Sequence, residues 1–103
     1  MSQPVAIGMD IGGTLVRLGA FDLAGQRLGQ KEASVASIGP ERGLRLIEDL
    51  IHDTVESVSG SLLGIGIGCT GPLDIRRGLV NNPYTLDGWS NVPIVEYLSQ
   101  ALH

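Results

Sequence analysis

The sequence predicts a mixed α/β domain in which antiparallel strands come first and a helix then crosses over to a fourth strand. Two observations predict this order. Three strand-like segments follow one another with only short turns between them, which is typical of an antiparallel meander. A long amphipathic segment then precedes another apolar run, which is typical of a helical crossover.

Composition supports a folded domain and argues against several functions. Mean hydropathy is +0.20 and only 17% of the 103 residues are charged, whereas disordered chains combine low hydrophobicity with high charge. The formal net charge of -4 argues against a protein that binds nucleic-acid phosphates. Glycine is unusually frequent at 15 residues, about twice the average share of roughly 7%. Such an excess indicates tight turns or backbone that lies close to a ligand.

The sequence shows no signal for export or membrane insertion. Its first residues lack the basic start and apolar stretch of a signal peptide, and no apolar run approaches the roughly 20 residues of a membrane span. The single cysteine, Cys69, has no partner for an internal disulfide and belongs to no zinc-binding cluster. We therefore expect a cytoplasmic protein with neither a membrane nor a nucleic acid as partner.

Three strands are predicted at the start of the chain. Val5–Ile11 is an apolar run that ends at two glycines, which predicts a buried strand entering a turn. Thr14–Phe21 predicts a second strand. A turn at residues 22–26 leads to Arg27–Val35, whose mixed polarity predicts a third strand that is partly exposed.

A helix is predicted next. Gly39-Pro40-Glu41 is typical of a helix start, because proline suits the first turn and an acidic side chain suits the positive end of the helix dipole. Apolar residues then recur every three or four positions, and Gly60 is the predicted end. The recurring residues are Leu44, Ile47, Leu50, Ile51, Val55 and Val58.

The last third of the chain alternates between strand and helix signals. Leu62–Gly68 is apolar enough to predict a fourth strand buried on both faces. Residues 74–80 predict a small hairpin or a loop excursion. A final helix is predicted to begin near residues 91–93, with Ile94, Val95, Leu98 and Leu102 on one face. Because a crossover helix normally returns to the sheet, we expect residues 1–103 to be the N-terminal part of a longer protein.

The first glycine cluster predicts a phosphate site. Asp10-Ile11-Gly12-Gly13-Thr14 lies where the first two strands join, and a turn without side chains exposes backbone N–H groups that bind phosphate. Thr14 adds a hydroxyl donor. Asp10 would hold Mg²⁺ directly or through water, because this cation prefers carboxylate and water oxygens. The alternative is an ordinary hairpin in which Asp10 hydrogen-bonds the turn.

The second glycine cluster contains Gly64, Gly66, Gly68 and Gly71. Residues 66–71 fit the pattern G-x-G-x-x-G of dinucleotide-binding turns. Such a turn must open directly into a helix, with an acidic residue about 20 positions later. Here Pro72-Leu73-Asp74 leads to another turn instead, and position 91 is asparagine, so a dehydrogenase is disfavoured.

Together these motifs resemble those of the ROK family, which comprises repressors, uncharacterised reading frames and sugar kinases. The resemblance extends in register over essentially the whole chain. It rests on residues 10–14, 64–74, 78–83 and 88–93. The family includes bacterial glucokinases, fructokinases and N-acetylmannosamine kinases.

The resemblance implies a fold and an activity. The fold would be ribonuclease H-like, of the actin and hexokinase ATPase type, with residues 1–103 as its smaller N-terminal lobe and the C-terminal lobe outside this sequence. The activity would be ATP-dependent phosphorylation of a hexose or amino-hexose, with Mg²⁺, in a cleft between the lobes. The family also implies a homo-oligomer at full length, and a cysteine-rich zinc loop beyond this segment.

The resemblance assigns roles to seven residues. The phosphate-binding set would be Asp10, Gly12, Gly13 and Thr14, with Asp10 organising Mg²⁺, most simply through water. The segment that touches or borders the sugar would contain Gly71, Pro72 and Asn82.

Two departures from the family pattern affect these expectations. Cys69-Thr70 stands where many relatives have a valine-proline pair, which alters one edge of the predicted sugar pocket. The family's catalytic base is the aspartate of an Asn-Asp pair in a later strand, and no Asn-Asp dipeptide occurs in these 103 residues. We therefore expect no catalytic residue in this chain and no sugar phosphorylation by it alone.

Two other functions stay open at this point. One is a sugar-sensing regulator of the same family without kinase activity. Family repressors carry a winged helix-turn-helix before the Asp-x-Gly-Gly-Thr motif, and only nine residues precede Asp10, which favours the kinase. The other is an inactive fragment, which detectable binding of nucleotide or sugar would exclude.

Three further residues could have a functional or a structural role. Arg17 would either face a phosphate or pair with an acidic residue, whereas a charged side chain on a strand more commonly lies in solvent. Trp89 is expected to pack against the lobe instead of stacking on a sugar. Asp74 is expected to cap or brace its loop.

Overall fold

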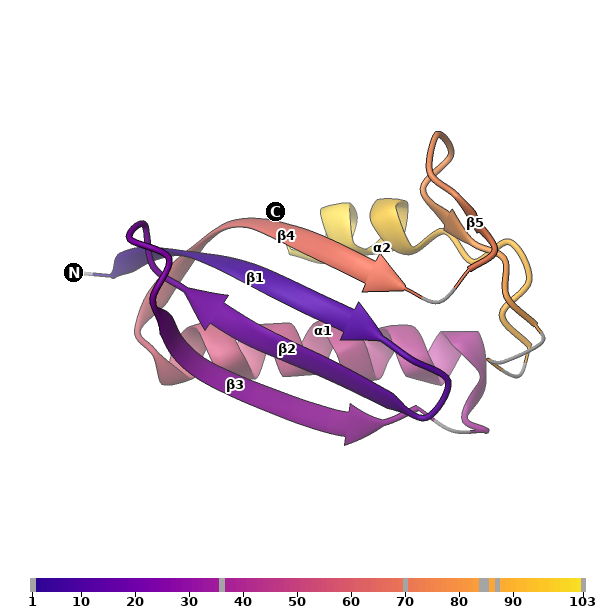
Figure 1. The fold of residues 1–103 in the computed structure, drawn as a ribbon, viewed down its shortest axis with the longest axis horizontal. Coiled ribbons are helices and arrows are strands. Elements are labelled where there is room, and N and C mark those ends of the chain that lie inside the picture. The colour runs from indigo at the N-terminus through magenta and orange to yellow at the C-terminus, as the bar shows by residue number, and fades with distance from the viewer. Residues whose placement is uncertain (1, 36, 70, 84–85, 87, 103) are drawn as a thin grey trace.

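The structure is a computed structural model, and it describes residues 2–35, 37–69, 71–83, 86 and 88–102. Figure 1 shows the long strands forming one sheet, with the helices on the same side of it. The order of elements confirms the predicted mixed α/β domain. In chain order they are β1 (Gln3–Ile11), β2 (Leu15–Phe21), β3 (Arg27–Ser34), α1 (Gly39–Ser57), β4 (Gly60–Cys69), β5 (Leu73–Asp74), β6 (Leu79–Val80) and α2 (Ile94–Ala101).

The main sheet has the strand order β3-β2-β1-β4. β1 pairs antiparallel with β2, and β2 pairs antiparallel with β3, which confirms the predicted meander. β4 pairs parallel with β1, so α1 carries the chain across the sheet from one edge to the other. The predicted crossover is therefore confirmed as well.

The core lies between the sheet and the helices. Every second residue of β1 is buried, from Val5 to Ile11, because successive side chains of a strand point to opposite faces. Buried leucine and isoleucine side chains of α1 cover this face. We call the opposite side of the sheet the outer face. In the described part of the chain no helix covers the outer face, and it bears Ala6, Gly8 and Asp10.

The prediction that the fourth strand is buried on both faces is wrong. Within the residues that the structure describes, β4 lies at the edge of the sheet with alternating exposure, and Leu63 is 61% exposed. Leu62, Ile65 and Ile67 are only partly buried where they pack against the core. The run is apolar because of this one packed face, while its alternating glycines add no polar side chains to the other.

Gly60 does not end the helix as predicted. α1 ends at Ser57, and the reversal passes through Ser59, which has a left-handed φ of 51° and donates its N–H to the Glu56 carbonyl at 3.1 Å. Gly60 instead opens β4. A Cβ at this position would lie 2.7 Å from Cγ2 of Val5, so the glycine allows β4 to approach β1.

The predicted hairpin and final helix are both present. β5 and β6 pair antiparallel, and α2 begins at Ile94. Ile94 and Leu98 are buried as expected, but Val95, predicted on the same face, is 51% exposed. Val95 lies against the hairpin turn, where a Cβ at Gly78 would come within 2.7 Å of the valine Cβ. Neither of the two described helices is long and apolar enough to span a bilayer.

Trp89 packs inside the lobe, as the sequence predicts. Its side chain is fully buried against α1, where a Cβ at Gly43 would lie only 2.6 Å from Cζ2 of the indole. The absence of a side chain at Gly43 therefore lets the loop before α2 dock on the start of α1.

Candidate functional site

The two glycine clusters meet at one edge of the sheet. β1 and β4 are parallel, so both strands end there, with Asp10 beside Gly68 and Ile11 beside Cys69. The β1–β2 turn leaves from this edge, and so does the segment that begins at Gly71. Ligands of open α/β sheets bind outside the carboxyl ends of parallel strands, which makes this edge the candidate site.

The turn between β1 and β2 is held by its backbone. The N–H of Gly12 donates to the Leu15 carbonyl at 2.8 Å, and the N–H of Val35 donates to the Thr14 carbonyl at 2.9 Å. Within the described part of the chain, the N–H groups of Gly13 and Thr14 have no acceptor. Two backbone donors are thus available to an anion, and the phosphate-binding role of residues 12–14 stays a prediction that this geometry permits.

The Asp10 carboxylate lies on the outer face at the end of β1. Its side chain is exposed, and it accepts no hydrogen bond from the β1–β2 turn among the described residues, so the ordinary hairpin alternative is not what the structure has. A Cβ at Gly68 would lie 3.8 Å from the Asp10 Oδ1 atom. Gly68 therefore leaves open space beside the carboxylate.

The residues at this edge fit a magnesium ion bound together with phosphate. No group of three or more histidine, cysteine, aspartate or glutamate side chains forms a metal cluster among the residues described. Mg²⁺ usually keeps several waters and takes one or two carboxylates plus phosphate oxygens. One exposed carboxylate, Asp10, fits such a site, in which water and phosphate would supply the other oxygens, and the N–H groups of Gly13 and Thr14 would bind the phosphate and not the metal.

Cys69 behaves as a small core residue and not as a nucleophile. Burial, and after it the negative charge of Asp10, raises the pKa of the Cys69 thiol. The thiol is therefore protonated at neutral pH, where a reactive cysteine would be a thiolate. The effect of Asp10 also reflects how close the ends of β1 and β4 lie.

The segment predicted to border the sugar follows β4 directly. Gly71 and Pro72 are both exposed, and the peptide bond between them is cis. The Pro72 carbonyl accepts a hydrogen bond from the N–H of Asn81 at 3.1 Å. This bond joins the Gly71-Pro72 segment to the loop that contains Asn82.

Asn82 is fully buried. Its N–H donates to the Trp89 carbonyl at 2.8 Å, and its carbonyl accepts from the N–H of Leu86 at 3.1 Å. Asn82 therefore shapes the loop that packs Trp89 onto α1, a role that the sequence did not reveal. Its predicted place at the border of the sugar stays a prediction.

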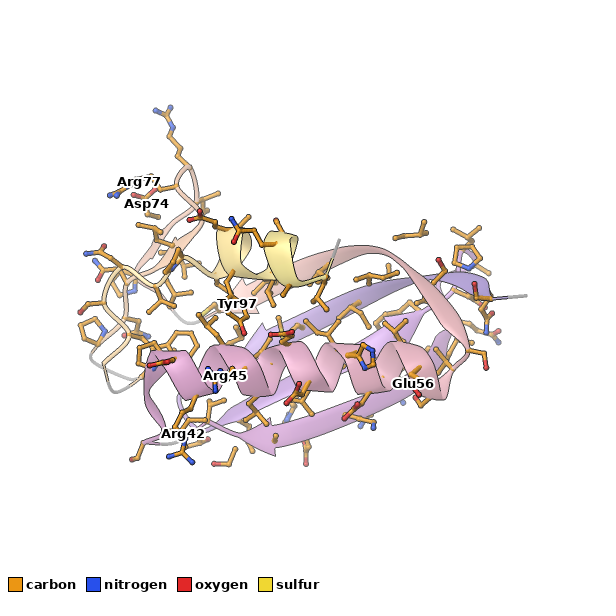
Figure 2. The ribbon with its side chains drawn as sticks, turned by 180° about the vertical axis from the view of Figure 1, so that it is seen from behind. Arg42, Arg45, Glu56, Asp74, Arg77 and Tyr97 are labelled. Carbon is orange, nitrogen blue, oxygen red and sulfur yellow. The ribbon has the colours of Figure 1, made fainter. Side chains whose placement is uncertain are left out.

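Arg17 pairs with an acidic residue, and Asp74 braces its hairpin as the sequence predicts. The Arg17 Nε atom lies 3.3 Å from a Glu32 carboxylate oxygen, and both side chains are mostly exposed. The Arg77 N–H donates to the Asp74 Oδ1 atom at 3.1 Å, which braces the hairpin. Figure 2 shows Asp74 and Arg77 together on the hairpin, well away from α1.

Sequence reasoning missed two contributors to this edge, Gly68 and the N–H of Asn81. The alternating glycines at 64, 66 and 68 indicated one strand face, but only the parallel register with β1 places Gly68 beside Asp10. No sequence signal identifies the backbone bond from Asn81 to Pro72.

The candidate site is a shallow, exposed surface. A shallow groove of about 330 Å³ crosses the outer face next to Asp10; it is lined by Gly8, Met9, Asp10, Arg17, Leu18, Gly19, Phe21 and Arg27. Two larger hollows are lined mainly by apolar residues: one of about 380 Å³ lies among α1, β4 and the end of α2, and one of about 430 Å³ lies between β4 and α2. Asp10 lines neither of them, so the hollows do not mark the predicted chemistry.

Known proteins of one family resemble this chain in sequence and in fold. The family model described as "ROK family" matches residues 6–103. The ROK hexokinase of Thermus thermophilus superposes with a TM-score of 0.85 at 28% identity, covering 95% of this chain and 32% of that one. A ROK family glucokinase of Streptomyces griseus, solved with glucose and AMPPNP, gives a TM-score of 0.77 at 26% identity, covering 93% and 30%.

A third solved structure shows that the fold is not limited to kinases. A ROK family transcriptional regulator, homologous to the E. coli MLC protein, gives a TM-score of 0.79 at 15% identity and covers 95% of this chain and 25% of that one. No curated protein matches the sequence. The chain spans about a third or less of the length of these solved proteins, and the matches confirm the predicted fold.

Proposed function

The chain belongs to the ROK family, and from this premise we propose that it forms the phosphate-binding lobe of an ATP-dependent sugar kinase. The observation that carries the proposal is the meeting of two segments at one sheet edge. The turn after Asp10 offers backbone donors for phosphate, and Gly71-Pro72 offers an exposed border for the sugar. Phosphoryl transfer needs its two substrates held side by side in this way.

The similar solved proteins support ATP and a sugar as the substrates. The Thermus protein is a hexokinase, and the Streptomyces glucokinase was solved with glucose and an ATP analogue bound. We propose glucose as the first sugar to test and hexoses or amino-hexoses as the substrate class. The whole protein is further proposed to be cytoplasmic and to form a homo-oligomer.

The proposed reaction joins a sugar hydroxyl to the γ-phosphoryl group of ATP. The hydroxyl oxygen forms a bond to the γ-phosphorus, the bond from that phosphorus to the β–γ bridging oxygen breaks, and ADP leaves. The N–H groups of Gly13 and Thr14 would donate to phosphate oxygens and stabilise the charge in the transition state. Mg²⁺, which Asp10 would hold through water, would neutralise part of the phosphate charge when bound.

The remaining steps divide between this chain and the rest of the protein. Gly71 and Pro72 would position the sugar, supported by the hydrogen bond from Asn81. The hydroxyl proton would pass to a base in the part of the protein that follows this chain. We propose the aspartate of an Asn-Asp pair for that role, since neither the motif nor another matching carboxylate occurs in these residues.

An assay of the longer protein tests the proposal. ADP release from MgATP is measured in a coupled assay with glucose, fructose, mannose and N-acetylmannosamine in turn. We expect ADP release that depends on the sugar, and we expect an Asn-Asp pair in the sequence that follows residue 103. Sugar-independent or absent ADP release would reject the kinase.

A sugar-sensing regulator is the second candidate, favoured by the shared fold of the transcriptional regulator. Such a protein would bind sugar without releasing ADP. Sugar binding measured by calorimetry in a protein that shows no turnover would therefore select the regulator, and it would also predict a different residue at the aspartate position.

A further inference from the structure

We propose that Arg17 is a second phosphate-binding residue of this site and that Glu32 holds its guanidinium until a nucleotide binds. The proposal rests on the proposed function, because it concerns the same phosphate group. With Arg17 in this role, the outer face of the sheet contacts the nucleotide together with the β1–β2 turn.

The register of the sheet places Arg17 next to Asp10. The two residues are partners across β1 and β2, and both line the shallow groove on the outer face. Side chains at directly opposite positions of antiparallel strands have Cβ atoms about 5 Å apart. Arg17 is also only two residues into β2 from its start at Leu15, or about 7 Å along the strand from the turn.

The chemistry of the groove favours an anion near Arg17. Asp10 and two unpaired N–H groups would bind a magnesium triphosphate, which brings several negative charges to this edge. Only two cationic side chains, Arg17 and Arg27, line the groove within the described residues, and Arg17 is the one that faces Asp10. A guanidinium presents a planar fork of donors that matches phosphate oxygens.

The contact with Glu32 is of the kind that a phosphate can replace. Asp10, Arg17 and Glu32 stand in a row across β1, β2 and β3. The Arg17 Nε atom is 3.3 Å from a Glu32 oxygen, with the two side chains 67% and 57% exposed. Exposed pairs of this kind contribute little free energy. We therefore expect phosphate to displace the Glu32 carboxylate from Arg17. Removing Arg17 should weaken phosphate binding, and removing the Glu32 charge should strengthen it.

The test measures binding of Mg²⁺ with ATP, and of Mg²⁺ with inorganic tripolyphosphate, to the longer protein by calorimetry. Arg17→Met should weaken both ligands about tenfold or more, as expected for loss of a charge-assisted hydrogen bond. Arg17→Lys should lose less, because it keeps the charge. Glu32→Gln should tighten binding by up to about fivefold, because it removes the competing carboxylate.

Arg27→Met is the matched control. It removes the same charge from the same groove, but Arg27 pairs with Phe21, four residues further along β2, or about 13 Å from Arg17. The Arg27→Met variant should bind both ligands with an affinity within about twofold of that of the unaltered protein. Melting temperatures of all variants exclude unfolding as a cause.

The outcomes separate this proposal from the function it rests on. If the unaltered protein binds MgATP and Arg17→Met binds it as tightly as Arg27→Met does, the role of Arg17 is rejected and the kinase stands. If Glu32→Gln weakens binding as much as Arg17→Met, the pair is only structural and the exchange is rejected. If the unaltered protein binds neither ligand, both proposals fall.

Discussion

Asp10 is a residue whose proposed function can be separated from stability. Its carboxylate is exposed and makes no hydrogen bond to the neighbouring turn among the residues described. We predict that Asp10→Ala lowers sugar-dependent ADP release of the longer protein by about 100-fold or more, because the cation that neutralises the phosphate charge loses its carboxylate partner. Its free energy of unfolding should change by less than about 0.5 kcal/mol.

Asp22→Ala is a control variant that should lose stability but not activity. The Asp22 Oδ1 atom accepts hydrogen bonds from the N–H groups of Ala24 and Gln26 at 3.0 and 2.9 Å, at the opposite end of the sheet from Asp10. This variant should lose about 1 kcal/mol of stability and keep its activity. Near-normal ADP release in Asp10→Ala would reject the proposed role of that carboxylate.

The sequence could name the residues of the site but not their neighbours. The motifs at residues 10–14 and 71–72 are local patterns, and the structure brings both to one edge of the sheet. Their closeness depends on β1 and β4 being parallel and in one register, which no local pattern encodes. For the same reason Gly68 was missed, and the burial of Asn82 followed from packing of a loop that has no periodic signal.

Within β4, Gly60 and Gly64 differ in how much space surrounds them. A Cβ at Gly60 would collide with Val5, whereas a Cβ at Gly64 meets nothing within 4 Å. We predict that Gly60→Ala destabilises the protein by about 1–3 kcal/mol, because the buried and rotationally restricted Val5 cannot move aside. Gly64→Ala should be neutral or stabilising by up to about 1 kcal/mol, because alanine costs less backbone entropy than glycine.

Urea unfolding of the two variants checks this pair. Both carry the same substitution in the same strand, so a general effect of alanine on β4 would change them equally. Equal midpoints for Gly60→Ala and Gly64→Ala would contradict the packing of β4 against β1 described above.

A polar contact joins α2 to α1. The Tyr97 hydroxyl donates to a Glu48 carboxylate oxygen at 2.5 Å, and Figure 2 shows Tyr97 on α2 beside α1. This hydrogen bond raises the pKa of Tyr97, with burial as a smaller cause. Its contribution is fully present below the ordinary tyrosine value of about 10 and is lost as the pH rises through the raised value.

We therefore predict a pH-dependent difference between the unaltered protein and Tyr97→Phe. At about pH 8 the variant should be less stable by about 1 kcal/mol, since it lacks the hydrogen bond. The difference should shrink as the pH rises above about 10, because the tyrosinate can no longer donate. Urea unfolding at several pH values measures this difference in stability. A difference that does not change with pH would show that the contact is not made.

Strand and helix signals located the elements well because they are local. The predicted Val5–Ile11 lies inside β1, and the predicted hairpin and second helix are both found. The errors about β4 and Gly60 concern non-local facts. β4 lies at an edge, which depends on sheet order, and Gly60 is required by the approach of a strand from elsewhere in the sequence.

At the scale of the whole molecule, the described lobe is one wall of a proposed cleft. Its outer face and the Asp10 edge are open, and the chain spans about a third of the Thermus relative. We predict that the 103-residue chain alone shows no sugar-dependent ADP release, because no residue in it matches the family's base. Steady turnover above background by the purified chain would contradict this division of roles.

Phosphate binding by the β1–β2 turn is best tested by amide chemical-shift mapping of the longer protein during titration with Mg²⁺ and AMPPNP. If the β1–β2 turn binds phosphate, the largest shifts belong to Gly13 and Thr14, with smaller ones at Gly12 and Gly68. Shifts that leave Gly13 and Thr14 unchanged, or that gather along the hollows beside β4 and α2, would contradict the account.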